Sequence, residues 1–65
     1  MWAVVYVATN RTVAEELKEF LTKEGFLVKI RMLNKKGQKE NGYYEILVPE
    51  AEAEEVHGIL LNKGF

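Results

Sequence analysis

The sequence predicts a small α+β domain whose elements follow one another in the order β-α-β-β-α. Residues 2–8 form a β-branched and aromatic run that is too short for a buried helix. Residues 26–33 and 43–48 alternate in polarity, which is typical of strands with one packed face. Two apolar stripes at helical spacing, one after the first strand and one after the third, complete the pattern. One domain over residues 1–65 is expected.

The first strand is predicted over residues 2–8, and a helix follows it. The run that begins at Thr12 and ends at Glu15 has the capping-box spacing, in which hydroxyl and carboxylate satisfy each other's free amides. Gly25 supplies the left-handed turn that commonly ends a helix. The apolar stripe of this helix consists of Val13, Leu17, Phe20 and Leu21.

The second and third strands are separated by a polar segment. Residues 34–42 contain two glycines and three lysines, which indicates a turn or loop. In the strand at residues 43–48, Glu45 prefers water, so Tyr44 and its alternate neighbours are expected to face the helices. In the strand at residues 26–33, the packed face is predicted to hold Phe26, Val28, Ile30 and Met32.

The second helix is predicted to begin at Pro49, which suits the first helical position. Gly64 is expected to end it. A run of glutamates matches the positive end of this helix, and apolar residues recur at helical spacing behind it. The glutamates are Glu50, Glu52, Glu54 and Glu55, and the apolar stripe is Ala53, Val56, Ile59 and Leu60.

The chain contains a weak internal repeat. A shift of 39 residues places residues 4–26 over 43–65 with six identities, and a Gly-Phe pair closes both halves. The full form of such a repeat is the ferredoxin-like fold, whose right-handed crossovers place the third strand between the first two. We therefore expect an antiparallel sheet of order 1-3-2, with both helices on one face and without the fourth strand. The uncharged first strand would then be a free edge that invites another chain.

Composition argues against an enzyme. The 65 residues include no Cys, no Ser, no Asp and one His, and the net charge is −1. A disulfide, a thiolate metal site and a serine or cysteine nucleophile are excluded. His57 is interpreted as a solvated surface residue, and the glutamates as a solvated helix end. No glycine-rich phosphate loop is present. We expect no catalytic residue, no metal and no cofactor.

The longest apolar run, residues 1–8, is shorter than a membrane span and lacks the basic start of a signal peptide, so the cytoplasm is the expected compartment. A net charge of −1 gives no general attraction to nucleic acid or anionic lipid. The partners expected are therefore a second copy of the chain or another protein.

The sheet face without helices is the most suggestive surface. If Val5 and Val7 face the helices, Tyr6 points outward with Trp2 and Val4. An apolar face of this size is typical of an oligomer interface, so we expect a homodimer through this face, through residues 2–8, or through both. The face is expected to hold Trp2, Val4, Tyr6, Leu27, Lys29, Arg31, Tyr43, Glu45 and Leu47. The predicted contact residues are Trp2, Tyr6, Arg31, Tyr43 and Leu47.

A different class of function is the alternative. Aromatic and basic side chains on an exposed sheet are how RRM-type domains stack bases, and a weak nucleic-acid or nucleotide binder would use Tyr6, Lys29, Arg31 and Tyr43. The RNP motif is absent and the net charge is negative, so we favour an interface between proteins.

Charge is unevenly distributed along the second half of the chain. Residues 27–42 carry five basic side chains and one Glu, whereas residues 43–56 carry five Glu and no base. The simpler interpretation is two solvated surfaces. The functional interpretation is a basic loop, with Lys35, Lys36 and Lys39, that docks an anionic ligand, an acidic partner or the acidic helix of a neighbouring subunit.

Several segments resemble a known family. They are residues 5–10 (VYVATN), 24–26 (EGF), 44–50 (YEILVPE) and 53–56 (AEEV). Together they resemble a bacterial domain family of unknown function, described as prokaryotic signal-transducing proteins and related to the nitrogen-regulatory PII proteins. The resemblance covers nearly the whole chain. It implies a ferredoxin-like or PII-like domain with a regulatory role and brings no catalytic residues. The PII proteins bind nucleotide between subunits and signal through a long loop; residues 34–42 are shorter and contain no nucleotide-binding motif.

Overall fold

A computed structural model describes residues 1–33 and 42–65, and it confirms a small α+β fold with the element order β-α-β-β-α. A short 3₁₀ turn, η1, precedes the second helix. The elements are β1 (Trp2–Ala8), α1 (Arg11–Lys23), β2 (Lys29–Leu33), β3 (Tyr43–Pro49), η1 (Glu50–Glu52) and α2 (Ala53–Lys63).

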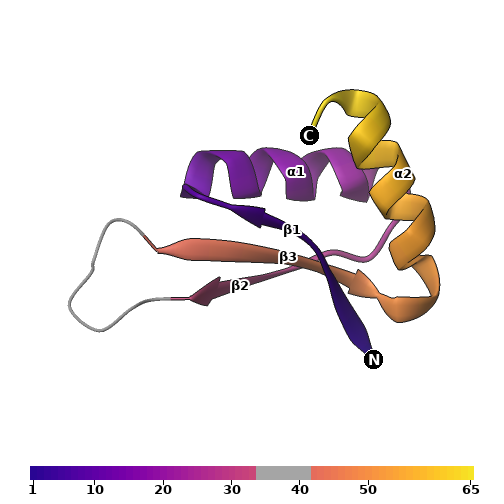
Figure 1. Cartoon of the computed structure of the whole chain (residues 1–65), viewed down its shortest axis with the longest axis horizontal. Helices are drawn as coiled ribbons and strands as arrows, with labels where there is room; N and C mark the ends of the chain where they lie inside the picture. Colours follow the sequence, from indigo (N-terminus) through magenta and orange to yellow (C-terminus); the bar gives the residue numbers. More distant parts are fainter. Residues whose placement is uncertain (34–41) are drawn as a thin grey trace.

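The described strands form one antiparallel sheet in the order β1-β3-β2, as predicted. Both helices lie on the same face of this sheet, where α1 packs mainly on β3 and α2 mainly on β1 (Figure 1). Within the described residues β3 is therefore the central strand, and β1 and β2 are the edges. The opposite face of the sheet is covered by neither helix.

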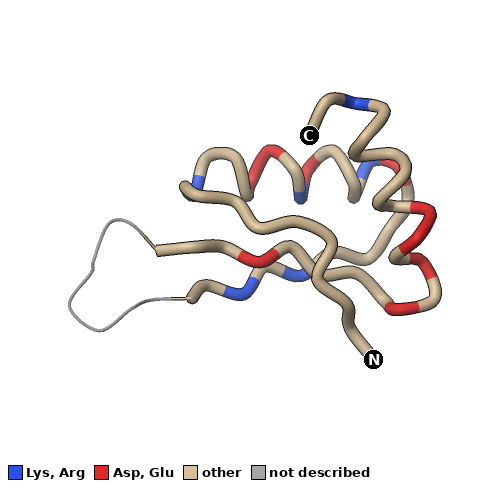
Figure 2. Tube along the Cα trace, in the orientation of Figure 1, with Lys and Arg blue, Asp and Glu red and all other residues tan. Residues whose placement is uncertain are grey.

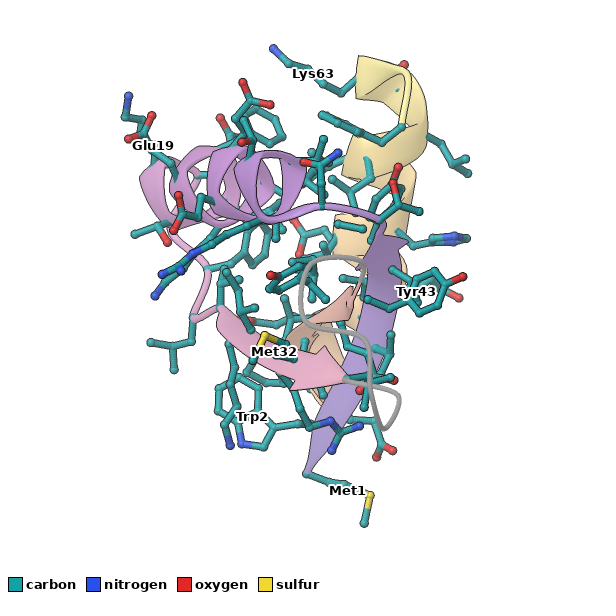
Figure 3. The ribbon with its side chains drawn as sticks, turned by 90° about the vertical axis from the view of Figure 1, so that its left-hand side faces the viewer. Met1, Trp2, Glu19, Met32, Tyr43 and Lys63 are labelled. Atoms are coloured by element: carbon teal, nitrogen blue, oxygen red, sulfur yellow. The ribbon has the colours of Figure 1, made fainter. Side chains whose placement is uncertain are left out.

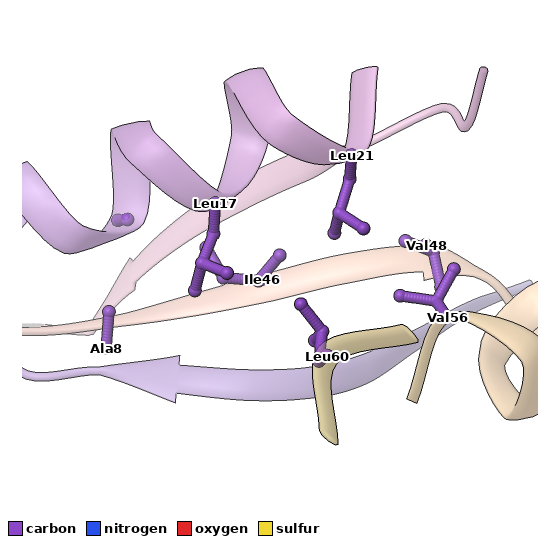
Figure 4. Packing of buried hydrophobic residues seen from close by; sticks show 8 residues of the cluster. Ala8, Leu17, Leu21, Ile46, Val48, Val56 and Leu60 are labelled. Carbon is purple, nitrogen blue, oxygen red and sulfur yellow. The ribbon is translucent and has the colours of Figure 1, made fainter. Parts of the chain in front are cut away.

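The core lies between the helices and β3. Leu17 and Leu21 descend from α1 onto Ile46, and α2 contributes further aliphatic side chains from the side (Figure 4). The predicted packed face of β3 is confirmed, because Tyr44 and Ile46 both contact this cluster. The fully buried residues of the cluster are Ala8, Ala14, Leu17, Leu21, Ile46, Val48, Val56 and Leu60.

A β-bulge in β1 changes which side chains face the helices. Val4 opposes Leu47 and Tyr6 opposes Ile46, so Val5 has no direct partner on β3. A bulge inserts one residue and reverses the alternation beyond it. The prediction that Tyr6 points away from the helices is therefore wrong, since Tyr6 shares the face of Ile46 and packs against the core.

The start of α1 also differs from the prediction. Asn10, not Thr12, caps the helix: its side-chain oxygen accepts a hydrogen bond from the Val13 N–H at 2.9 Å. The Glu15 carboxylate instead accepts a hydrogen bond from Arg11 Nε at 3.0 Å. The predicted capping box is wrong because Asn is an equally good cap and precedes the threonine by two residues.

Two further boundaries are corrected. Pro49 is the last residue of β3 and precedes η1, so it is not the first residue of α2. The strand β2 begins at Lys29 rather than Phe26, which leaves Leu27 outside the sheet. Phe26 and Val28 still pack against the core, which explains why their spacing resembled that of a longer strand.

The internal repeat has a structural counterpart in the ends of the two helices. Gly25 and Gly64 both have a φ of 99°, in the left-handed region that only glycine adopts readily. In each half the phenylalanine that follows donates its N–H to a leucine carbonyl five residues earlier, at 3.1 Å for Phe26 and 2.9 Å for Phe65. This arrangement is the Schellman motif, and it confirms the predicted end of each helix.

Candidate interaction surface

The candidate surface is the face of the sheet opposite the helices, called here the open sheet face. Residues directly opposite each other in antiparallel strands share a face, so the strand register defines its members. From β1 it holds Trp2, Val4 and Val7, from β3 Tyr43, Glu45 and Leu47, and from β2 Lys29, Arg31 and Leu33.

An ion pair lies at the centre of the open sheet face. Arg31 opposes Glu45 in the register, and its Nε donates to Glu45 Oε1 at 2.6 Å, with Nη2 close to the same oxygen. The Glu45 side chain is only 16% exposed although no helix covers it, because Arg31 lies on one side and Val7 opposes it on the other. The central carboxylate is therefore compensated within the domain.

Leu47 is buried on the open sheet face without belonging to the core. It is only 4% exposed, yet it lies outside the cluster beneath the helices. Val4 and Lys29 oppose it from the two edge strands, and the Lys29 ammonium lies 5.0 Å from the centre of the Trp2 ring. Figure 3 shows Trp2 on the side of β2 away from α1. The indole and the lysine together cover the central strand at this end.

The side chains that shield the centre remain partly exposed themselves. Five large apolar residues of the open sheet face are each between 42% and 47% exposed. Several half-exposed apolar side chains gathered on one face are typical of an interaction site. These residues are Trp2, Val4, Val7, Leu33 and Tyr43.

The structure brings together four of the five predicted contact residues. Trp2, Arg31, Tyr43 and Leu47 all lie on the open sheet face. Tyr6 lies on the other side of the sheet, where its ring makes an edge-to-face contact with Phe65 at a centroid distance of 5.8 Å.

Two further residues lie on the open sheet face. Val7 was expected to face the helices, and this expectation is wrong because the bulge turns Val7 to the face of Glu45. Leu33 lies at the end of β2, opposite Tyr43, and the alternation of residues 26–33 did place it on this face.

The alternative of a nucleic-acid interface loses support from the same geometry. Tyr6 is turned toward the core, Arg31 is held by Glu45, and Lys29 lies over Trp2. Of the four residues that this alternative requires, only Tyr43 presents its side chain on the open sheet face without one of these contacts. Base stacking normally needs two or more aromatic platforms with free cations beside them.

The distribution of charge follows the fold. Figure 2 shows basic positions along β2 and acidic positions along η1 and the start of α2. The predicted basic loop, with Lys35, Lys36 and Lys39, lies outside the described residues.

Metal-ligating side chains do not cluster in the part of the chain that the structure describes. Within residues 1–33 and 42–65, no three His, Asp or Glu side chains come together as metal ligands. His57 is exposed on α2, as interpreted from the sequence. In the same part of the chain, neither helix has the length and apolar character that a membrane crossing demands.

Comparisons with protein-family models, with curated protein sequences and with solved structures found no significant match to this chain.

Proposed function

We propose that this chain is a non-enzymatic, regulatory protein-interaction domain that associates with a second copy of itself through the open sheet face. The observation that carries the proposal is the set of five half-exposed apolar side chains on the open sheet face, three along β1 and two where β3 and β2 meet the segment between them, beside the buried Leu47 and Glu45. Half-exposed apolar side chains lose their remaining contact with water in an interface, which contributes about 25 cal/mol for each Å² covered.

A second copy suits this surface for two reasons. A two-fold contact places the same patch against itself, so the patch must not oppose uncompensated like charges. The central charges, Arg31 and Glu45, are already paired within each copy. A standard interface covers about 800 Å² on each partner, which is roughly a sixth of the 4872 Å² surface of this domain.

The regulatory part of the proposal is supported by the resemblance to the prokaryotic signal-transducing family. The absence of Cys, Ser and Asp from the sequence supports the non-enzymatic part.

The test is a matched pair of lysine substitutions. Leu33→Lys places a charge in the open sheet face, whereas Leu27→Lys places the same charge outside the sheet on a side chain that is 69% exposed. Sedimentation equilibrium from micromolar to millimolar protein should show dimerisation of the parent and of Leu27→Lys. For Leu33→Lys the dissociation constant should rise about tenfold or more, which corresponds to about 1.4 kcal/mol. A parent chain that stays monomeric throughout, or equal effects of the two substitutions, would overturn the proposal.

A further inference from the structure

Two of the hollows on the surface lie between a helix and the sheet, one beside α1 and one beside α2. The first has a volume of about 370 Å³ and lies between α1 and the sheet. Its helix wall includes Ala14, Glu15 and Lys18, and its sheet wall consists of Ile30, Met32 and Tyr44. The strand β2 therefore supplies most of the floor of this hollow.

The second hollow lies at the other edge of the sheet, beside the start of α2. It has a volume of about 300 Å³ and is lined by Val4, Val5, Ala53, Glu54 and His57. Its sheet wall comes from β1 alone, whose outer edge has no partner among the described strands.

The two hollows are related by the internal repeat. When the sequence is aligned with itself at a shift of 39 residues, Ala14 aligns with Ala53, Glu15 with Glu54 and Lys18 with His57. The same shift aligns Val5 with Tyr44, so four of the five residues of the second hollow are the repeat equivalents of residues in the first. The strand that supplies Ile30 and Met32 has no counterpart beside β1 in the described residues. The second hollow therefore has the same kind of helix wall as the first hollow, but it lacks a strand in the position that β2 occupies in the first.

The first hollow shows what would fit the second. The strand β2 is five residues long and runs antiparallel to β3, with Ile30 and Met32 directed to the helix side. In the internal repeat, β1 corresponds to β3 and α2 corresponds to α1. An occupant that corresponds to β2 would therefore run antiparallel to β1 and direct aliphatic side chains at alternate positions toward α2. The N–H and C=O groups on the outer edge of β1 would supply the backbone hydrogen bonds, as in other cases of strand addition. No charged side chain of Trp2–Ala8 guards this edge.

The charge around the second hollow indicates a basic occupant. The first hollow is bordered by Arg11, Glu15 and Lys18. The equivalent positions in the second half are Glu50, Glu54 and His57, so two cations are replaced by a carboxylate and an imidazole. Figure 2 shows acidic positions on η1 and the first turns of α2, the helix whose Ala53, Glu54 and His57 line this hollow. An acidic rim attracts cationic chains and repels acidic ones.

We propose that the outer edge of β1 and the hollow beside α2 accept an extended segment of a partner protein, with aliphatic residues at alternate positions and an overall positive charge. The segment adds to the sheet antiparallel to β1. The proposal rests on the proposed function of the chain as an interaction domain, and it names the class of partner. The site lies at the outer edge of β1 and shares Val4 with the open sheet face, whereas Ala53, Glu54 and His57 belong to this site alone.

The test uses the sequence of β2 itself as the probe. A capped peptide, Val-Lys-Ile-Arg-Met-Leu, is titrated into the isotope-labelled 65-residue chain, and amide shifts are recorded. A second peptide, Val-Glu-Ile-Glu-Met-Leu, keeps the aliphatic pattern and reverses the charge. We expect the basic peptide to move the amides of residues 3–8 and 53–57, and we expect the acidic peptide to bind at least about tenfold more weakly.

A matched pair of variants locates the charge effect. Glu54→Lys reverses a residue of the hollow, and Glu55→Lys makes the same change of net charge on the neighbouring exposed residue, which does not line it. Glu54→Lys should weaken binding of the basic peptide about 3- to 10-fold, and Glu55→Lys less than about twofold. Thermal melts of both variants check that the fold is kept.

Several results would overturn the inference. Shifts confined to the open sheet face would place the peptide elsewhere, and equal weakening by the two variants would reduce its binding to general charge attraction. Shifts of the amides of residues 53–57 that grow with protein concentration in the Leu33→Lys variant, and that the peptide does not compete with, would show that a second copy occupies the edge.

The Leu33→Lys variant separates this inference from the proposed function. If peptide binding persists in a chain that never self-associates, only the face-to-face association fails. If self-association responds to Leu33→Lys but no peptide binds, only the strand-acceptor site fails.

Discussion

The central strand β3 is buried on both faces, but by different means. On the helix side, Ile46 and Val48 are fully buried beneath α1 and α2. On the open sheet face, exposure falls along the strand from 45% at Tyr43 to 16% for the Glu45 side chain and 4% at Leu47, with no helix above them. Side chains from the two edge strands do the covering there.

This difference between the two faces of β3 explains where the exposed apolar surface of the domain lies. Under the helices, the residues that cover β3 are themselves buried. On the open sheet face the covering layer is one side chain thick, so its apolar members Trp2, Val4 and Val7 stay about half exposed. This face protects its centre and leaves an apolar outer layer that a partner can bury.

The largest expected effect compares two neighbouring residues that point to opposite faces. Ile46→Ala removes a fully buried side chain from the core and should cost about 3–5 kcal/mol, which is most of the stability of so small a domain. Leu47→Ala should cost about half as much, because Trp2 and Lys29 can collapse over the space. Urea unfolding followed by circular dichroism measures both values. Equal losses would show that the open sheet face holds a second core.

A smaller effect is expected when the cover of Leu47 is removed. Trp2→Ala should lower the free energy of unfolding by about 1–2 kcal/mol, through lost apolar contact and the lost cation–π contact with Lys29. Trp2→Phe keeps a ring and should recover about half of the loss. The indole fluorescence of the parent chain, followed during urea unfolding, should change together with the circular dichroism signal. A fluorescence change at clearly lower urea would mean that the indole does not pack as described.

The smallest expected effect concerns the central ion pair. A double-mutant cycle with Arg31→Met and Glu45→Gln should give a coupling of about 0.5–1 kcal/mol, since the guanidinium side chain is more than half exposed. The coupling should decrease in high salt because mobile ions screen exposed charges. A coupling of zero would show that the pair orders the face without stabilising the fold.

The element order and most of the core were accessible from the sequence because they depend on local periodicity. The stripes on α1 and α2, the alternation of β3 and the stops at Gly25 and Gly64 each follow from residues within one element. The helix start at Asn10 was missed because two good caps stand close together and local propensity does not choose between them.

The candidate surface was accessible in part. Trp2, Arg31, Tyr43 and Leu47 follow from alternation and lie on the predicted face. Tyr6 does not, because the bulge beside Val5 arises from the fit between β1 and β3 and leaves no signature in β1 alone.

By itself, the sequence determined the fold class, the helical stripes and the repeat, because each is written in the spacing of apolar residues and glycines along a single element. Only the tertiary structure decided which residues of β1 face outward, how Leu47 is covered without a helix, and that the hollow beside α2 repeats the one that β2 lines. These features depend on register and on side chains meeting across strands that lie far apart in the chain, and the pattern of one strand does not contain the position of its neighbour.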